Sequence, residues 1–288
     1  MTAEDLRPLM LSIAYRMVGS FSEAEDIVQE AFLRLHEAGD VESPKAWLST
    51  VVTRLSIDHL RSARVRREQY PGTWLPEPVV ADPAPDAVVR AESLSLAVLV
   101  LLESLTPVER AVFVLREAFD YGYDEIAAIV DKSQDNVRQL ALRARRHVDE
   151  RRPRFEPSRE QRDELVRRFV AALTQGETEP LVELLAEDAA FYGDGGGKAP
   201  ALTEAHGRDR LARALAGFGR VGVRRGGVVR VAEINGQAGV LGFDADGTLI
   251  AAWEVQISDG AIQAIYGVVN PDKLAHISST ILPSLPPA

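Results

Sequence analysis

The chain has 288 residues, no cysteine and a formal net charge of −10 at pH 7. This length suggests about two or three domains, and the absence of cysteine excludes disulfides and thiolate metal sites. Acidic residues near the N-terminus and the lack of a long apolar run predict a cytoplasmic protein without a membrane segment, while the acidic balance argues against a protein that coats DNA unaided.

Residues 23–37 are the first segment with a clear helical pattern. Apolar side chains recur there at three- and four-residue spacing and predict a buried stripe. The opposite face is mostly acidic, whereas a solvated helix face normally mixes both signs of charge. It consists of Asp26, Gln29, Glu30, Leu33 and Glu37. This face fits either plain exposure to solvent or the docking of a basic protein partner.

The next segment, residues 43–67, is helical and rich in arginine. Its arginines are Arg54, Arg61, Arg64, Arg66 and Arg67, with Asp58 as the only acid among them. Such a cluster in an acidic chain suggests DNA contact assisted by a partner, or else a solvated helix face. Residues 71–90 then contain five prolines, which cannot sustain a helix and predict a semi-rigid linker.

Residues 121–148 predict two helices joined by the three-residue turn Asp131-Lys132-Ser133. Ser133 is placed to cap the second helix. Apolar residues of that helix recur at helical spacing and should face inward, which leaves an outer face of amides and guanidinium groups. The outward side chains are Gln134, Asn136, Arg138, Gln139 and Arg143. Such groups form paired hydrogen bonds with base edges, so the segment is either a DNA-binding helix-turn-helix or an ordinary helical hairpin.

The second half of the chain predicts an α+β domain with an antiparallel sheet. Two helices, at about 159–175 and 178–186, precede a glycine-rich loop and four strands at 228–234, 239–243, 249–257 and 262–269. Asn-Gly and Asp-Gly pairs between the strands predict hairpins. Both faces of the sheet are largely apolar, so we expect one to pack on helices and the other to line a cavity. Polar candidates near that cavity are Asp194, His206, Glu254 and Tyr266.

The segment GDGGGKA at residues 193–199 is not a phosphate-binding loop. The loop motif needs glycine where Tyr192 stands and a hydroxyl where Ala199 stands. Three consecutive glycines instead indicate positive φ angles or close approach of the backbone to another surface. We expect Lys198 to pair with an acid of the linker or the helical half, and Glu77 is the first candidate; a solvated lysine is the alternative.

AEDIVQEAFLRL at residues 24–35 and SPKAWLSTVVTRLSIDHLRSARVRR at 43–67 resemble domain 2 of the extracytoplasmic-function (ECF) sigma factors of bacterial RNA polymerase. The resemblance implies that an acidic helix face binds the clamp helices of the largest core subunit. It also implies that the loop at about 37–44 captures a flipped base of the -10 element while the following helix tracks the melting duplex. The implied core-binding residues are Asp26, Gln29, Glu30 and Leu33, and the implied -10 contacts are Lys45, Arg54, Arg61 and Arg64.

Residues 105–148 resemble domain 4 of the same family, which reads the -35 element through its second helix. The implied -35 contacts are Gln134, Asn136, Arg138, Gln139 and Arg143. The family usually has glycine at the turn where this chain has Asp131, and aspartate tolerates the left-handed backbone at modest cost. Two matches in the expected order, separated by a linker, are far more specific than either one alone.

The C-terminal half resembles the SnoaL-like cone fold, and three short strings resemble the subgroup of ECF sigma factors with a fused SnoaL-like domain. In that subgroup the fused domain is taken to regulate activity in cis, so no separate anti-sigma factor is expected. The strings are WLPEP (Trp74, Leu75, Pro76, Glu77, Pro78), DGGGK (Asp194, Gly195, Gly196, Gly197, Lys198) and NPDKL (Asn270, Pro271, Asp272, Lys273, Leu274).

The sequence therefore predicts two all-α sigma domains followed by an α+β SnoaL-like domain. The expected plan is domain 2 at 1–70, the linker at 71–90, domain 4 at 91–153, the SnoaL-like domain at 158–276 and a tail at 277–288. The expected function is that of an alternative sigma factor acting on core polymerase and promoter DNA, without catalytic residues, metal, cofactor or membrane contact. A small ligand in the cone is the further partner that the resemblance allows. Two alternatives stay open: a ligand-sensing repressor, and a SnoaL-like enzyme with a DNA-binding appendage.

Overall fold

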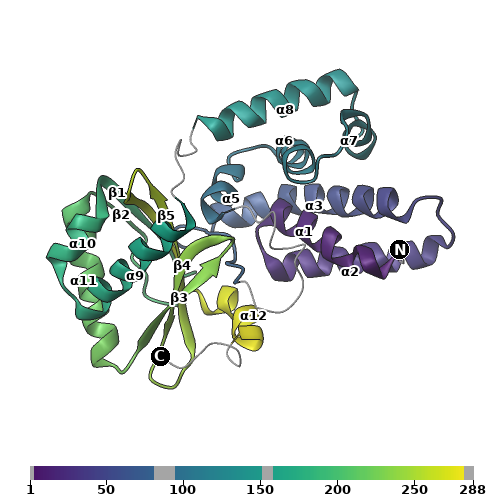
Figure 1. The fold of residues 1–288 in the computed structure, drawn as a ribbon. Helices are drawn as coiled ribbons and strands as arrows, with labels where there is room; N and C mark the ends of the chain where they lie inside the picture. Colours follow the sequence, from purple (N-terminus) through teal and green to yellow (C-terminus); the bar gives the residue numbers. More distant parts are fainter. Residues whose placement is uncertain (1–2, 81–94, 151–157, 282–288) are drawn as a thin grey trace. The chain divides into compact units, whose positions relative to one another are not determined.

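The computed structural model describes residues 3–80, 95–150 and 158–281, and Figure 1 traces their helices and strands. These residues form two compact units. The first contains residues 3–69 and 98–150, and the second contains residues 70–80, 95–97 and 158–281. No helix within the described ranges is both long and apolar enough to cross a lipid bilayer.

The N-terminal part of the first unit is a group of helices around an apolar core. A short 3-10 turn, η1 (Glu4–Leu6), leads into α1 (Arg7–Val18), α2 (Phe21–Ala38) and α3 (Pro44–Glu68). Gly19 ends α1 in the left-handed conformation, and the Ser20 side chain accepts a hydrogen bond from the Glu23 N–H to cap α2. The apolar stripe predicted for α2 is buried against α1 and α3.

The remainder of the first unit carries the predicted helix-turn-helix. Its elements are α5 (Leu96–Leu102), whose first two residues belong to the second unit, α6 (Pro107–Phe113), a π-helical turn η2 (Val114–Ala118), α7 (Tyr123–Val130) and α8 (Gln134–Asp149). Asp131 ends α7 with φ 54°, and the Ser133 side chain accepts a hydrogen bond from the Asn136 N–H at 3.3 Å. Both helices and the turn between them are confirmed.

A buried polar contact joins the two helical groups of the first unit. Arg110 in α6 is 1% exposed, and its Nε donates a hydrogen bond to the carbonyl oxygen of Arg16 at 3.1 Å. Glu103 forms ion pairs with both Arg110 and Arg67, and Arg67 also donates to the carbonyl oxygen of Val18. Arg110 is buried, whereas Glu103 and Arg67 are partly buried, so loss of Glu103 would leave the buried charge of Arg110 without its carboxylate partner.

The second unit is an α+β domain with a six-stranded sheet in the order β2-β1-β6-β5-β4-β3. Its elements in chain order are α9 (Arg159–Gln175), α10 (Thr178–Leu184), β1 (Leu185–Asp194), β2 (Glu204–His206), α11 (Arg208–Arg224), β3 (Val228–Ile234), β4 (Gln237–Phe243), β5 (Leu249–Ser258), β6 (Ala261–Val268) and α12 (Pro271–Ile281). The four predicted strands are confirmed to within two residues at each end. The sequence pattern missed β1, β2, α11 and α12.

The expectation of an antiparallel sheet was wrong at one pair of strands. β1 and β6 pair in parallel, whereas the other neighbours are antiparallel. A parallel pair requires a long crossover, and here the chain between β1 and β6 contains α11 and four further strands. Two predicted turns have the expected geometry, since Asn235-Gly236 and Asp259-Gly260 all have positive φ angles.

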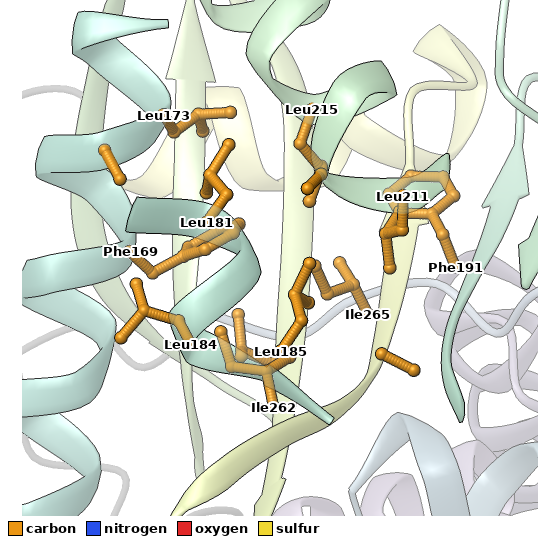
Figure 2. Close-up of a cluster of buried hydrophobic side chains, with 14 of the residues drawn as sticks. Phe169, Leu173, Leu181, Leu184, Leu185, Phe191, Leu211, Leu215, Ile262 and Ile265 are labelled. Atoms are coloured by element: carbon orange, nitrogen blue, oxygen red, sulfur yellow. The ribbon is translucent and has the colours of Figure 1, made fainter. Parts of the chain in front are cut away.

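Helices α9, α10 and α11 cover one face of the sheet with the main hydrophobic core (Figure 2). Phe169 and Leu173 of α9 and Leu215 of α11 meet strand residues such as Phe191 and Ile265. α9 and α11 pack closely at Gly219, where only glycine fits. A Cβ added there would lie 1.7 Å from the carbonyl oxygen of Leu173. The predicted packing of one sheet face on helices is therefore confirmed.

The other face of the sheet differs from the expected open cavity. Cross-strand pairing places Glu254 beside Tyr266, and Asp194 beside Val268, on this face. Segments 70–80 and 95–97 of the same chain bind to it, so Glu254 and Asp194 are both 0% exposed. The predicted linker and the start of α5 supply the cover, because Leu75 of the linker and Leu96 of α5 are themselves fully buried.

Candidate functional site

The acidic face of α2 lies on the surface of the first unit. Asp26, Gln29 and Glu30 are all exposed, and Leu33 is 54% exposed although it is apolar. Glu30 forms an ion pair with Arg34 one turn later at 2.8 Å. The four predicted core-binding residues therefore share one accessible face, and Leu33 is an exposed apolar side chain on that face.

The predicted -10 contacts on α3 occupy different environments. Lys45 and Arg61 are exposed; Lys45 lies over the ring of Tyr121, and Arg61 pairs with Asp58 at 2.9 Å. The side chain of Arg64 lies outside the described part of the structure. Arg54 donates to the carbonyl oxygens of Ile129, at 3.0 Å, and Ala128, at 3.3 Å. These carbonyls belong to the last turn of α7, where the helix dipole favours a cation.

The predicted -35 contacts lie together on the exposed face of α8. Gln134, Asn136, Arg138, Gln139 and Arg143 are all exposed, while Val137, Leu140, Ala141 and Ala144 are buried. Two of the arginines already have weak surface partners: Arg138 pairs with Asp135 at 3.0 Å, and Arg143 lies 3.8 Å from Glu109. The outer face of α8 is therefore polar and accessible, as a recognition helix requires.

Asp194 is the centre of a cluster that joins the linker to the α+β domain. The carboxylate lies at the end of β1 and accepts hydrogen bonds from the Tyr70 hydroxyl at 2.6 Å, the Leu75 N–H at 2.9 Å and the Gly196 N–H at 3.0 Å. Burial raises the pKa of the Tyr70 hydroxyl, and the neighbouring carboxylate adds to the rise. Asp194 therefore fixes both the side chain of Tyr70 and the backbone of Leu75.

Lys273 of the NPDKL segment completes this cluster, which we call the linker clasp: Tyr70, Trp74, Leu75, Asp194 and Lys273. The ammonium group is 2.7 Å from the Asp194 carboxylate and donates to the carbonyl oxygen of Leu75. It also lies over the rings of Trp74, at 4.2 Å, and Tyr70, at 5.0 Å. One cation thus contacts the ring of Tyr70 just before the linker, the linker ring of Trp74, a linker carbonyl and a buried carboxylate.

The glycines of DGGGK allow the linker to approach closely. Gly196 has φ 59°, and an added Cβ would lie 2.3 Å from the Asn270 amide nitrogen and 3.0 Å from the Tyr70 hydroxyl. Gly197 has φ 69°, and its added Cβ would lie 2.9 Å from the ring of Pro71. The expected positive φ angles and close approach are both confirmed, since any side chain here would push the linker away.

The expected partner of Lys198 was wrong. Lys198 pairs with Asp272 within the α+β domain, and both side chains are more than half exposed. Glu77 instead lies 4.0 Å from His276 of α12, whose other ring nitrogen is 3.0 Å from the carbonyl oxygen of Pro78. The three strings do meet, but the buried contacts run through Asp194 and Lys273.

Two further groups of hydrogen bonds extend the attachment of this segment to the α+β domain. The sequence pattern predicted neither of these contacts. The Val79 N–H donates to the Asn235 side chain at 2.9 Å, and the Asn235 N–H donates to the Val79 carbonyl oxygen at 2.8 Å. Beyond the linker, at the start of α5, Glu254 accepts hydrogen bonds from the N–H groups of Leu96, at 2.6 Å, and Ala97, at 3.3 Å. Burial raises the pKa of Glu254 to about 8. In the sequence, the only signal for Glu254 was that a charged residue stands in an otherwise apolar strand.

The four polar candidates for catalysis do not form one site. The carboxylates of Asp194 and Glu254 bind backbone groups of the linker. Tyr266 is buried beside Glu254, whereas His206 is exposed and contacts Glu204 at 2.5 Å. The two carboxylates on this sheet face therefore bind backbone groups of the same chain. The fold is that of a helical protein with a helix-turn-helix and an appended α+β domain.

Comparisons with known proteins refine this class. Residues 2–66 match the family model of Sigma-70 region 2, and residues 95–148 match that of Sigma-70, region 4. ECF RNA polymerase sigma factor SigJ of Mycobacterium tuberculosis (strain ATCC 25618 / H37Rv) is 40% identical over 287 residues, which cover 94% of this chain and 91% of the relative. Probable ECF RNA polymerase sigma factor SigI of Mycobacterium tuberculosis (strain CDC 1551 / Oshkosh) is 38% identical over 192 residues, or 62% of this chain and 64% of the relative.

The similarity extends through the α+β domain. The crystal structure of Mycobacterium tuberculosis SigJ matches with a TM-score of 0.76 and 35% identity, over 94% of this chain and 96% of that chain. The chain belongs to the ECF sigma factors of RNA polymerase, as its sequence motifs predicted.

Proposed function

We propose that this ECF sigma factor directs core RNA polymerase to its promoters through exposed faces on α2, α3 and α8, and that the α+β domain controls it in cis through the linker clasp. The observation that carries the proposal is the burial of Lys273 and Asp194 against the segment that connects the two sigma regions. Core polymerase and promoter DNA are the partners of this class of protein. We expect no separate anti-sigma factor and no catalytic activity.

The three faces have distinct roles in this proposal. Asp26, Gln29, Glu30 and Leu33 contact the clamp helices of the largest core subunit, with carboxylates facing a basic surface and Leu33 giving the apolar contact. The arginines of α3 contact the phosphates near the -10 element. The exposed amides and arginines of α8 contact base edges and phosphates of the -35 element. Arg54 must release the α7 carbonyls before it reaches DNA.

The regulatory role follows from two anchor points, one within the linker and one just beyond it in α5. Leu75 of the linker is held by Asp194 and Lys273, and Leu96 of α5 is held by Glu254, so both anchor points attach to one domain. Promoter DNA fixes the distance between the -10 and -35 elements, and the two sigma regions must match it. The stretch from Leu75 to Leu96, once released, reaches up to about 70 Å when extended. Opening the clasp, together with release of the buried Arg110 contact between the two helical groups, therefore changes the separations that the two DNA-contacting regions can adopt.

The test is promoter-specific run-off transcription with purified core RNA polymerase, on a template that carries the promoter upstream of the protein's own gene. Specific transcript from the parent chain and none from Asp26→Arg is the expected result for a sigma factor. Lys273→Met should change transcript yield, while Lys198→Met, which removes an exposed pair away from the buried clasp, should not. Equal yields from both lysine variants would refute cis control through the clasp.

A form that ends at Arg154 gives the sign of the control. More transcript than the parent chain means that the α+β domain inhibits, and less means that it activates. If no form bound core polymerase, the sigma-factor role would fail and an operator-binding repressor would be the next candidate. For the enzyme alternative, Asp194→Asn should abolish turnover of an apolar polycyclic substrate, whereas the buried position of Asp194 beneath the linker favours a structural role.

A further inference from the structure

Helix α11 carries a line of exposed arginines that none of the faces above includes. Arg210, Arg213, Arg220 and Arg224 are all exposed, and their spacing of three, seven and four residues places them in one row along the helix. The opposite side of α11 is buried in the core through Leu211, Ala212 and Leu215. We call these four arginines the α11 row.

The α11 row is strongly basic in an acidic protein. Residues 208–225 contain six arginines and one acid, Asp209, whereas the whole chain has a net charge of −10. Within the described residues, Arg210, Arg213 and Arg224 form no ion pair or hydrogen bond through their side chains, and Arg220 donates only to the carbonyl oxygen of Gly176. Elsewhere in the same domain, exposed arginines such as Arg159 and Arg167 have carboxylate partners.

Gly217 stands in the middle of the row and points to close approach by a partner. It occupies the position between Arg213 and Arg220 on the same side of the helix, and a Cβ added there would have nothing within 4 Å. Glycine weakens a helix interior relative to alanine, so an alanine would be favoured here if the helix faced only water. Gly219, by contrast, is required by the contact with Leu173. Gly222 of the same helix also has nothing within 4 Å, so what distinguishes Gly217 is its place within the row, where the missing side chain leaves room for a backbone to approach.

We propose that the α11 row binds the phosphate backbone of duplex DNA next to the promoter elements, so that the α+β domain adds sequence-independent affinity to the holoenzyme. This proposal rests on the proposed sigma-factor function, which brings the domain to DNA. The row extends over 14 residues, or about 21 Å, which is the length of about six base pairs. Unpaired guanidinium groups without intervening carboxylates match a polyanion, and they fit an ordinary protein surface of mixed charge less well.

The first test is the salt dependence of promoter binding by the reconstituted holoenzyme. The double variant Arg213→Gln/Arg224→Gln should lower the slope of log K against log salt by about 1.8, because each phosphate contact contributes about 0.9. The matched control Arg159→Gln/Arg167→Gln removes two exposed but ion-paired arginines of the same domain and should leave the slope near that of the parent. Equal slopes for the two double variants would overturn the proposal and leave an acidic protein as the partner of the row.

A second variant separates contact from stability. Gly217→Ala should raise the melting temperature of the protein, because alanine favours the helix, yet weaken holoenzyme–promoter binding, because the methyl group holds the DNA backbone away. Unchanged binding together with a raised melting temperature would count against close approach at Gly217.

A third test locates the DNA. Because the chain has no cysteine, Asp209→Cys gives a single attachment point for an iron chelate that cleaves nearby DNA by hydroxyl radicals. Conjugated protein, assembled with core polymerase on promoter DNA, should cut the duplex at one short stretch, while the cysteine-free parent treated with the same reagent should not. Transcription that Asp26→Arg abolishes, but without cleavage from position 209, would leave the sigma-factor function standing and refute the role of the α11 row.

Discussion

Replacing Lys273 with methionine tests the strength of the linker clasp. Methionine nearly preserves the length of the side chain and its contact with Trp74, but it removes the charged bonds to Asp194 and to the Leu75 carbonyl oxygen. Asp194 is 0% exposed and Lys273 is 7% exposed. Removing one member of a buried pair costs about 3–5 kcal/mol, because the other charge is left uncompensated. Asp194 keeps its bonds from Tyr70, Leu75 and Gly196, so we expect about 3 kcal/mol.

Hydrogen–deuterium exchange followed by mass spectrometry is the assay, because unfolding of a multidomain chain is not a single transition. If the clasp opens locally, a loss of about 3 kcal/mol makes exchange in the peptide over residues 70–80 roughly a hundredfold faster. Lys198→Met is the control, since its ion pair with Asp272 is exposed and such pairs contribute about 1 kcal/mol or less. Equal protection of residues 70–80 in the two variants would refute the argument that the buried ammonium group holds the linker.

Three other predictions follow from single residues. Because the pKa of Glu254 is raised in the folded state, folding favours the protonated carboxyl group. The free energy of unfolding of the α+β domain should therefore fall by at most about 5 kcal/mol as pH rises from about 4.5 to about 8. In thermal melts, Glu254→Gln should lose this pH dependence. Asp131→Gly should stabilise the first unit by about 0.5–1 kcal/mol in thermal melts, because residue 131 has φ 54° and glycine adopts this conformation without strain. A destabilised variant would show that contacts of the aspartate side chain outweigh the backbone strain. Gly219→Ala should cost about 3 kcal/mol or more in denaturation, because its Cβ would overlap the Leu173 carbonyl oxygen, while Gly222→Ala, with nothing within 4 Å, should not destabilise the domain.

The predictions that held from the sequence concern features set by near neighbours. Ser133 caps α8 because its hydroxyl reaches an N–H three residues later, and Asn235-Gly236 forms a hairpin turn because both residues accept positive φ angles. The exposed positions on α2 and α8 followed from helical periodicity, which fixes which side chains share a face. The family motifs likewise depend on short contiguous strings.

Some local patterns were still too weak to indicate an element. Strand β1 was missed because its first residues, Leu185-Ala-Glu-Asp, continue the helical composition of α10. Helix α11 was missed because glycines at 217, 219 and 222 interrupt an otherwise amphipathic helix. In both cases packing against the rest of the α+β domain overrides a local preference, which is the usual limit of propensity.

The sequence by itself determined the sigma-factor modules, the exposed polar face of α8 and the presence of three unusual strings. Only the tertiary structure decided how those strings meet. Lys198 has Asp272 as its partner, whereas Lys273 reaches back 198 residues to Leu75, and Glu254 reaches back 158 residues to Leu96. Contacts over such separations depend on the register of the sheet. The parallel pairing of β1 with β6 brings Asp194, at the end of β1, within 2.7 Å of the ammonium group of Lys273, which follows β6. No local pattern carries that information, because the energy of a buried ion pair depends on its surroundings in the folded chain.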